Sequence, residues 1–348
     1  MNFNQQTKIR VLVVDDSSYM RFILSRILEE DPDIEVVGRA RDGIEALAML
    51  PVEKPDVITL DVEMPRLNGF ETLERIFSVR PTPVVMVSQF TEANAETTMK
   101  ALELGAVDFV QKPQGSDALT MAKIKAELIS KVKVAARVTL SIGAYGQRSA
   151  QTWKPAKGTP AGVMKKVVVI ASSTGGPKAL ADVMTHIPAD APLGILIVQH
   201  MPEGFTASLA NRLNTLSPFA VSEAKEGDTL AVGRALLAPG NFHMRIRNGG
   251  RVYLSSADAV NNVRPAADVT MCDAADLFRD RVIGVVLTGM GTDGTRGGTA
   301  IREKGGVNIA QHGATCVVDG MPSSLVKAGQ ADRVAPLDRI ALEILALI

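Results

Sequence analysis

Residues 167–176 of the chain read VVVIASSTGG, an apolar run that ends in two serines, a threonine and two glycines. Four consecutive branched apolar residues are typical of a strand that is buried on both faces of a parallel sheet. The glycines that follow allow a tight turn into a helix. The segment therefore predicts a strand–turn–helix unit of an open α/β sheet, with Ser173 at the carboxyl end of the strand.

Two later segments show the same design. Residues 195–202 read ILIVQHMP and residues 282–294 read VIGVVLTGMGTDG, so His200 and Asp293 also follow apolar strands. Open α/β sheets bind their ligands at the carboxyl ends of the strands. Ser173, His200 and Asp293 supply the nucleophile, the base and the orienting acid of a hydrolytic triad. Their shared position at strand ends predicts an enzyme.

Each of these residues also has a simpler interpretation. A serine at a helix start is usually an N-cap, and an aspartate between glycines is usually a turn residue. Ser172 is an alternative nucleophile. The order Ser, His, Asp and the sequence ASSTG differ from the α/β hydrolases, which have a Gly-x-Ser-x-Gly turn. A dinucleotide site is disfavoured, because no G-x-G-x-x-G follows the strand and Gln199-His200 stand where a ribose-binding acid is expected.

Length and composition limit the number of domains and the classes of protein to which this chain can belong. A chain of 348 residues exceeds one ordinary hydrophobic core, so two domains are expected. The net charge is zero, which favours neither nucleic acid nor an anionic membrane as partner. The cysteines, Cys272 and Cys316, form neither a disulfide framework nor a zinc motif. The polar N-terminus lacks a signal-peptide core, and no apolar run approaches the roughly 20 residues of a membrane span. We expect a soluble, cytoplasmic protein without membrane insertion.

The chain alternates apolar strands with amphipathic helices in two blocks. Residues 8–130 predict a flavodoxin-like (βα)5 domain, and residues 166–348 predict a doubly wound α/β domain with a mostly parallel sheet. The predicted strands are residues 9–14, 34–40, 57–60, 84–88 and 108–110, then 167–170, 195–199, 235–238, 252–254, 282–287 and 307–310.

Residues 131–165 predict a linker, whose start is expected to continue the last helix of the first domain. From Lys131 to Lys166 there are eight lysines and arginines and no acid, so the rest of the neutral chain sums to −8. The stretch is either a solvated tether or a basic strip that lies along an acidic surface.

A second group of polar residues gathers in the first block. Asp15 and Asp16 close the first strand, Asp61 the third and Ser88 the fourth, while Lys112 follows the fifth. Three carboxylates at one sheet edge repel each other and need a cation, and oxygen ligands favour Mg²⁺. The metal and Lys112 could neutralise a phosphoryl group while Asp61 attacks it.

The motifs VVDDS (13–17), DVEMP (61–65) and GAVDFVQKP (105–113) resemble response-regulator receiver domains over residues 8–130. The resemblance implies that Asp61 accepts phosphate from a chemotaxis histidine kinase. It implies Mg²⁺ ligands at Asp16, Asp61 and the main-chain carbonyl of Glu63, with Asp15 binding the ion mostly through water, and a phosphorylation switch at Ser88, Phe109 and Lys112. Asn68 stands where many receivers carry Asp.

The motifs STGGP (173–177), QHMP (199–202), APGNFH (238–243) and LTGMGTDG (287–294) resemble the catalytic domain of CheB-type chemotaxis methylesterases. The resemblance implies removal of methyl groups from glutamate esters, and of ammonia from glutamines, on methyl-accepting chemoreceptors, with no metal in this reaction. Ser173 would be the nucleophile, His200 the base and Asp293 its orienter. Met290 would give an oxyanion N–H, Thr174 would support His200, and Met201 would line the groove.

Two departures from the methylesterase pattern are visible. Ala171-Ser172 replaces the usual Gly-Ala before the nucleophile, and Arg264-Pro265-Ala266 replaces Arg-Pro-Ser. The fusion predicts that the receiver covers the triad until Asp61 is phosphorylated. An alternative is a response regulator whose output domain binds a partner without catalysis. A DNA-binding regulator is disfavoured, because no compact helix-turn-helix pattern is present.

Overall fold

The computed structural model describes residues 8–89, 91–112, 118–138 and 162–348. The chain divides into two compact units, Met1–Ser149 and Ala150–Ile348. Each unit is an α/β layer structure, which confirms the predicted fold class.

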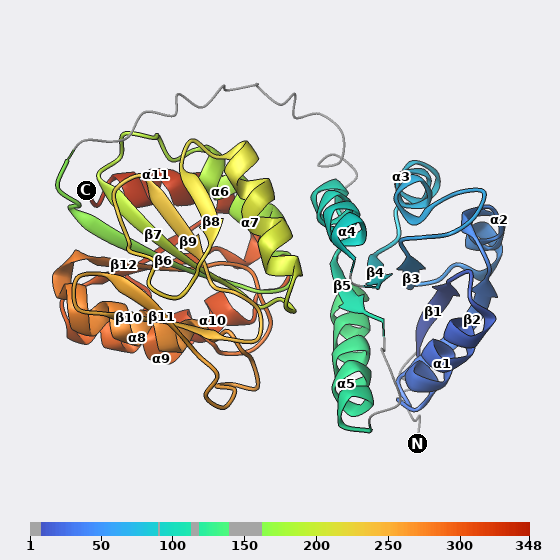
Figure 1. Ribbon diagram of the computed structural model, residues 1–348. Coiled ribbons are helices and arrows are strands. Elements are labelled where there is room, and N and C mark those ends of the chain that lie inside the picture. Colours follow the sequence, from blue (N-terminus) through green and yellow to red (C-terminus); the bar gives the residue numbers. More distant parts are fainter. Residues whose placement is uncertain (1–7, 90, 113–117, 139–161) are drawn as a thin grey trace, which may run out of the picture. The chain divides into compact units, whose positions relative to one another are not determined.

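The first unit contains a five-stranded sheet in the order β2-β1-β3-β4-β5, with all pairs parallel (Figure 1). This is the flavodoxin-like order, in which β2 lies on one side of β1 and the later strands, from β3 onward, lie on its other side. The strands are β1 (Ile9–Val14), β2 (Ile34–Ala40), β3 (Val57–Asp61), β4 (Val84–Ser88) and β5 (Asp108–Gln111). The helices are α1 (Ser18–Glu29), α2 (Gly43–Glu53), α3 (Gly69–Val79), α4 (Glu92–Leu104) and α5 (Ala118–Ala135).

Helix α3 begins beside the end of β3 because of three residues. Asn68 and Glu71 form a capping box, in which each side chain accepts a hydrogen bond from the backbone N–H of the other. A Cβ on Gly69 would lie 2.0 Å from the carbonyl oxygen of Asp61, so only glycine allows this approach. Asn68, the departure from the receiver pattern, therefore serves as a helix cap.

The second unit is built on a seven-stranded, wholly parallel sheet in the order β14-β13-β12-β6-β7-β9-β8. Its strands are β6 (Lys166–Ser172), β7 (Leu193–Gln199), β8 (Ala220–Glu223), β9 (Arg234–Leu237), β12 (Val282–Val286), β13 (Val307–Gln311) and β14 (Arg333–Ala335). A separate antiparallel hairpin joins β10 (His243–Arg247) to β11 (Arg251–Ser255).

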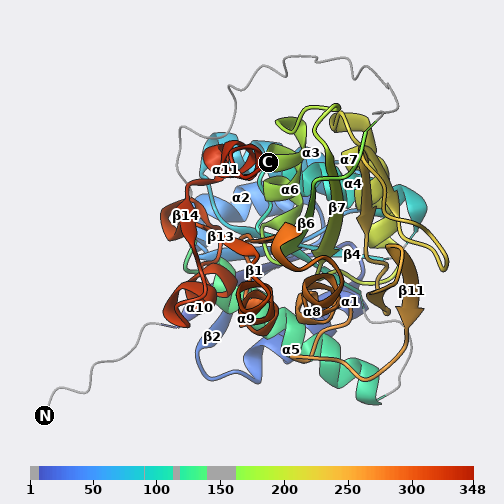
Figure 2. The same cartoon turned by 90° about the vertical axis from the view of Figure 1, so that its left-hand side faces the viewer.

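Helices cover both faces of this sheet. Figures 1 and 2 place α8 (Ala267–Phe278), α9 (Thr295–Glu303) and α10 (Met321–Lys327) on one face, and α6 (Gly176–Thr185), α7 (Phe205–Leu216) and α11 (Ile340–Leu345) on the other. Side chains of β6, β12 and α8 form one buried core cluster, which includes Val169, Met271 and Val286. The core thus fixes α8 and α9 close to the central strands.

Three strands were not predicted, namely β8, β10 and β14. β8 and β14 are short edge strands, and β10 alternates apolar and basic residues (HMRIR) instead of forming an apolar run. The predicted strand 252–254 lies in the hairpin with β10 and not in the main sheet.

Helix α5 continues to Ala135, so the basic stretch begins inside a helix, while residues 139–161 lie outside the described residues. Among the described helices, none combines the length and apolarity that crossing a membrane requires.

Candidate active site and candidate phosphorylation site

The turn that carries Ser173 and the turn that carries His200 follow neighbouring strands, and Asp293 follows the strand on the other side of β6. The backbone N–H of Ser173 donates to the carbonyl of Thr288 at 3.0 Å, and the N–H of His200 donates to the carbonyl of Ser172 at 3.0 Å. Sheet register therefore continues beyond the strand ends and brings the three turns together.

Glycines allow this close approach at Ser173. Gly175 has φ 77°, a left-handed conformation that glycine adopts without strain, and it begins α6. A Cβ on Gly289 would lie 2.7 Å from the Cβ of Ser173. The Ser173 hydroxyl makes no hydrogen bond to any part of the chain that the structure describes.

His200 and Asp293 form the second half of the predicted triad. His200 Nε2 lies 2.8 Å from Asp293 Oδ2, and their side chains are 10% and 2% exposed. Because Nε2 is bound to the carboxylate, Nδ1 is the ring nitrogen left to take a proton from a nucleophile. The Ser173–His200 hydrogen bond is not formed, as is common in ligand-free sites, where such bonds tighten on substrate binding.

Helix α8 holds the Asp293 carboxylate. Oδ2 accepts the N–H of Ala267 at 2.6 Å, and Oδ1 accepts the N–H of Asp268 at 3.0 Å. These are the first two N–H groups of α8, where the helix dipole favours a negative charge. Burial opposes ionisation, but the hydrogen bond and charge of His200, with the two backbone bonds, lower the pKa of Asp293. The carboxylate is thus kept ionised beside the imidazole.

Two residues that the sequence analysis missed complete this network. Asp268 is buried, and its Oδ1 accepts the N–H groups of Gly294 at 2.9 Å and Gly297 at 2.7 Å, at the start of α9. The amide of Asn261 donates to Asp268 Oδ2 at 2.9 Å and to Asp293 Oδ1 at 3.1 Å. Burial and the nearby Asp293 charge raise the pKa of Asp268. An acid in a helix first turn looks like an ordinary cap in sequence, so only the fold reveals this role.

Gln199 connects the nucleophile turn to the base turn. It is buried, and its Nε2 donates to the carbonyls of Ser173 at 2.9 Å and His200 at 3.1 Å. Its Oε1 accepts the hydroxyl of Ser172 at 2.7 Å. Ser172 is fully buried and already hydrogen-bonded, whereas the Ser173 side chain is half-buried and makes no hydrogen bond among the described residues. This difference favours Ser173 over Ser172 as the nucleophile.

The supporting residues occupy the same region. Met290 is 44% exposed, and the preceding Gly289 is fixed by an N–H donated to Val318 and by a carbonyl that accepts from Gly320 and Met321. The carbonyl of Thr174 accepts the hydroxyl of Thr288 at 2.9 Å. The buried Met201 follows His200 directly.

Ala266 occupies the N-cap position of α8 and gives it no side-chain hydrogen bond. The arginine of the same motif, Arg264, donates to the carbonyls of Ser256 and Ala257 and to Asn241 Oδ1. With no cap at Ala266, the Asp293 carboxylate is what satisfies the first N–H groups of the helix.

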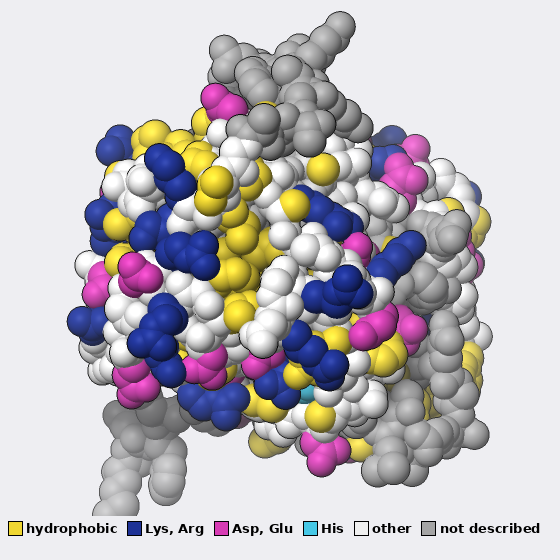
Figure 3. All heavy atoms as spheres, turned by 60° about the vertical axis from the view of Figure 1, so that its left-hand side comes forward, with side chains coloured by type: hydrophobic (Ala, Val, Ile, Leu, Met, Phe, Trp, Pro, Cys, Tyr) yellow, Lys and Arg dark blue, Asp and Glu magenta, His cyan; other side chains and the backbone are white. Residues whose placement is uncertain are grey.

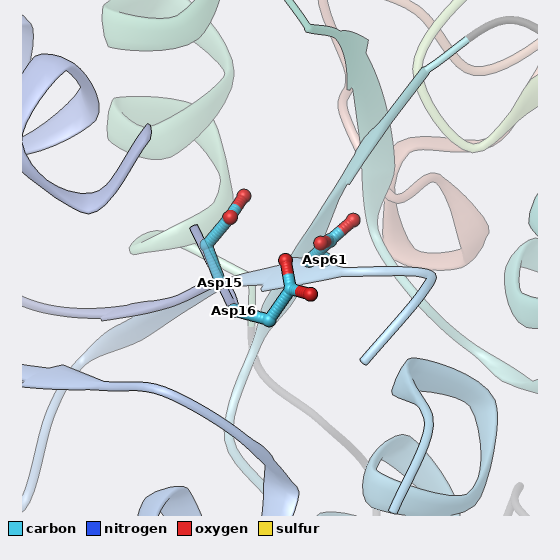
Figure 4. A group of neighbouring side chains, drawn as sticks. All are labelled: Asp15, Asp16 and Asp61. Atoms are coloured by element: carbon cyan, nitrogen blue, oxygen red, sulfur yellow. The ribbon is translucent and has the colours of Figure 1, made fainter. Parts of the chain in front are cut away.

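In the first unit, the predicted carboxylates converge. Asp15, Asp16 and Asp61 each offer an oxygen within 4.8 Å of the others, from the ends of β1 and β3 (Figure 4). Lys112 Nζ lies 2.8 Å from Asp15 Oδ2 and 2.7 Å from Asp61 Oδ2. Burial and the Asp15 charge outweigh the effect of Lys112 and raise the pKa of Asp61 to about 6. Three oxygen donors with excess negative charge fit a small hard cation such as Mg²⁺.

The other two predicted switch residues lie on the neighbouring strands β4 and β5. Ser88 is buried at the end of β4, and its hydroxyl donates to the carbonyl of Gln89. Phe109 is 2% exposed, and Lys131 of α5 donates to its carbonyl at 2.6 Å while lying 5.2 Å from its ring centre. The backbone N–H of Glu63 donates to Asp61 Oδ1 at 3.4 Å.

Comparison with known proteins gives consistent results. Residues 168–344 match the family model of the CheB methylesterase, and residues 11–124 match the response regulator receiver domain. A protein of Symbiobacterium thermophilum is 47% identical over 98% of this chain and 97% of its own length, and one of Thermotoga maritima is 45% identical over 98% of each. Both are named protein-glutamate methylesterase/protein-glutamine glutaminase.

The crystal structure of the Thermotoga maritima CheB methylesterase catalytic domain is similar to the second unit. It is 44% identical, covers 53% of this chain and 100% of its own, and has a TM-score of 0.52.

Proposed function

The chain belongs to the CheB methylesterase family, and we propose that its Ser173, His200 and Asp293 form the catalytic triad of a phosphorylation-gated enzyme. It is a protein-glutamate methylesterase and protein-glutamine glutaminase that carries a response-regulator receiver domain. The observation that carries the triad assignment is the Asp293–His200 hydrogen bond, with the carboxylate held ionised at the start of α8 next to the Ser173 turn.

The geometry supports an acyl-enzyme mechanism. Ser173 Oγ attacks the γ-carbonyl carbon of a glutamyl methyl ester, and His200 Nδ1 takes the hydroxyl proton. Asp293 stabilises the imidazolium that forms. When the tetrahedral intermediate collapses, His200 returns the proton to the leaving group, which departs as methanol. Water, activated by His200, then cleaves the acyl-enzyme to glutamate. A glutamine follows the same route and releases ammonia.

The negative charge on the carbonyl oxygen needs donors in the intermediate. We assign the backbone N–H of Met290 to this role, because the adjacent Gly289 lies against Ser173 and is held by Val318, Gly320 and Met321. Thr174 lies between the nucleophile and the α6 start and supports the same turn.

The substrate is proposed to be a methyl-accepting chemoreceptor, and the phosphodonor a chemotaxis histidine kinase. Asp61 is the proposed phosphoacceptor, because it is buried, contacts Lys112 and has neighbouring carboxylates. Asp15, Asp16, Asp61 and the carbonyl of Glu63 would hold Mg²⁺, which supplies charge neutralisation for the phosphoryl oxygens. Lys112 keeps its proton between two carboxylates and orients one phosphoryl oxygen.

We assign residues 8–130 to the receiver, 131–165 to the linker and 166–348 to the catalytic domain. Phosphorylation of Asp61 would release an inhibitory receiver. For a tenfold activation, phosphorylation needs to favour the open form over the closed form by only about 1.4 kcal/mol.

Methanol release from a methylated receptor fragment tests the proposal. Ser173→Ala should abolish release. Ser172→Ala is the matched control, since its hydroxyl bonds to Gln199, and this variant should retain release. Release that survives in Ser173→Ala would transfer the nucleophile role to Ser172. A phosphorylated wild type that binds the fragment without releasing methanol would favour a non-catalytic output domain.

DNA binding lacks support. On the face drawn in Figure 3, the described basic and acidic side chains are interspersed and form no continuous basic surface.

A further inference from the structure

The hydroxyl of Thr288 joins three segments that lie far apart in the sequence. Thr288 follows the end of β12 and is 1% exposed. Its hydroxyl lies 2.9 Å from the carbonyl oxygen of Thr174 and 3.3 Å from that of Val318, and it accepts the backbone N–H of Val318 at 3.0 Å. Threonine hydroxyls commonly bond to nearby backbone, as Thr215 does to Asn211 in its own helix. Thr288 instead connects the nucleophile turn, the turn after β12 and the segment that precedes α10.

The backbone of Thr288 is also held on both sides. Its carbonyl accepts the N–H of Ser173 at 3.0 Å, and its N–H donates to Gln311 Oε1 at 2.8 Å. Gln311 is buried at the end of β13, so this second bond is fixed to the sheet. The position of Ser173 is therefore coupled to that of Thr288 through both the backbone and the side chain of the threonine.

Met290, the proposed oxyanion donor, lies two residues after Thr288. The N–H of Gly289, between them, donates to the carbonyl of Val318 at 3.0 Å, and the carbonyl of Gly289 accepts the N–H of Met321 at 2.9 Å. Val318 thus bonds both to the Thr288 hydroxyl and to Gly289. An oxyanion donor must lie within roughly 2.7–3.1 Å of the developing charge, so a small displacement of this turn would weaken the stabilisation.

The two branches of the Thr288 side chain have different surroundings. The hydroxyl makes the bonds described above, whereas the methyl group faces the turn before α6, since a Cβ on Gly175 would lie 3.2 Å from Thr288 Cγ2. We propose that Thr288 is a positioning residue, whose hydroxyl holds the Met290 N–H at its working distance from the carbon that Ser173 attacks. This role rests on the proposed function, because it takes ester hydrolysis by Ser173 as the reaction.

Thr288→Val is the first test, because it keeps the shape of the side chain and removes the hydroxyl. The full-length chain, activated by a small-molecule phosphodonor with Mg²⁺, is assayed for methanol release from a methylated receptor fragment. We expect kcat to fall at least about tenfold with KM within about twofold, since the oxyanion forms only after the substrate is bound. Thr288→Ser keeps the hydroxyl and should stay within about twofold of the wild-type kcat. Equal losses of kcat in the two variants would assign the effect to packing of the methyl group and overturn the proposal.

A transition-state analogue measures the oxyanion site without turnover. In a peptide that carries a trifluoromethyl ketone in place of the γ-ester, Ser173 Oγ adds to the ketone carbon. The hydroxyl proton passes to His200, and the ketone oxygen takes the negative charge. The inhibition constant for methanol release should rise about tenfold or more in Thr288→Val, in parallel with the loss of kcat. An unchanged inhibition constant would refute the role of the hydroxyl.

Ser217→Ala is the matched control. The Ser217 hydroxyl is also buried, donates to the carbonyl of Met184 at 3.2 Å and accepts the N–H of Phe219 at 3.0 Å. Ser217 precedes the parallel strand β8, so it lies at the sheet edge opposite to the strand carboxyl ends. Denaturant unfolding should show a similar loss of stability for Ser217→Ala and Thr288→Val, whereas kcat should fall only in Thr288→Val. A fall of kcat to the same extent in both variants would indicate a merely structural role and contradict the proposal.

A second pair of variants isolates the hydroxyl if Thr288→Val does not fold. Thr288→Ser and Thr288→Ala both lack the methyl group and differ only in the hydroxyl, so a higher kcat in Thr288→Ser supports the proposal and an equal kcat refutes it. A wild type that releases no methanol would refute the proposed function and this role with it. A wild type that releases methanol with the same kcat as Thr288→Val would refute this role alone.

Discussion

Asp293 and Asp268 each accept hydrogen bonds from the helix that begins beside the other. Asp293 precedes α9 but binds the first N–H groups of α8, while Asp268 lies in the first turn of α8 and binds the N–H groups at the start of α9. Asn261 donates to both carboxylates. The orienting acid of the triad is therefore held by a reciprocal contact between two helices.

Asp268→Ala should destabilise the protein and reduce turnover together. It leaves the buried N–H groups of Gly294 and Gly297 without acceptors, which should cost roughly 2–4 kcal/mol of unfolding free energy. Asp268→Asn keeps one acceptor oxygen and should lose less than half of this. Denaturant unfolding and methanol release measure the two effects. Full activity in Asp268→Ala would show that the Asp293 turn does not depend on α8.

The stabilisation from Asp293 should depend on pH with a fixed sign. Its pKa is lowered from the ordinary 3.8 in the folded protein, so its contribution is fully present above that value and is lost as the pH falls below it. The stability difference between wild type and Asp293→Asn should shrink as the pH falls below roughly 4, where the Asp293 carboxylate begins to gain a proton. A difference that grows as the pH falls below roughly 4 would contradict the ionised assignment.

Gln199 should matter for catalysis although it takes no part in the proposed chemical steps. Gln199→Glu keeps the shape of the side chain but removes the donor that binds the carbonyls of Ser173 and His200. We expect kcat to fall at least about tenfold, because the nucleophile and base lose their common support. Ser172→Ala removes only the bond to Oε1 and should cost about 1 kcal/mol of stability with little change in kcat.

The receiver should inhibit the esterase until it is phosphorylated. Residues 166–348 alone should release methanol faster than the unphosphorylated full chain. A small-molecule phosphodonor with Mg²⁺ should raise the rate of methanol release by the full chain toward that of the fragment. Asp61→Asn or removal of Mg²⁺ should prevent this rise. A folded fragment that is no faster than the full chain would exclude inhibition by the receiver.

Much of this architecture was predictable because strands that are buried on both faces leave a direct trace in sequence. The apolar runs located the central strands of both sheets, and the polar residues that follow them located Ser173, His200 and Asp293. Edge strands such as β14, with three residues, leave no comparable pattern. Periodicity also did not separate the hairpin strand β11 from the parallel sheet.

The supporting residues could not be predicted, because their roles depend on contacts between distant segments. Asp268 lies 25 residues before Asp293, and Asn261 precedes it in a loop with no regular pattern. The motif STGGP favours Ser173 over Ser172 in the sequence, and the burial of Ser172 with its bond to Gln199 supports the same choice. A sequence shows which residues of a strand are buried. It does not show which helix N-terminus a distant side chain will cap.

The reciprocal capping of α8 and α9 has a consequence for how this domain can change during evolution. Within the part of the chain that the structure describes, the Ser173 side chain makes no hydrogen bond and could be replaced without harming the fold, whereas Asp293 connects two helices. A descendant that abandons ester hydrolysis should therefore lose its serine early and keep its aspartate. The aspartate alone would then be a poor marker of activity in distant relatives, and the serine a good one.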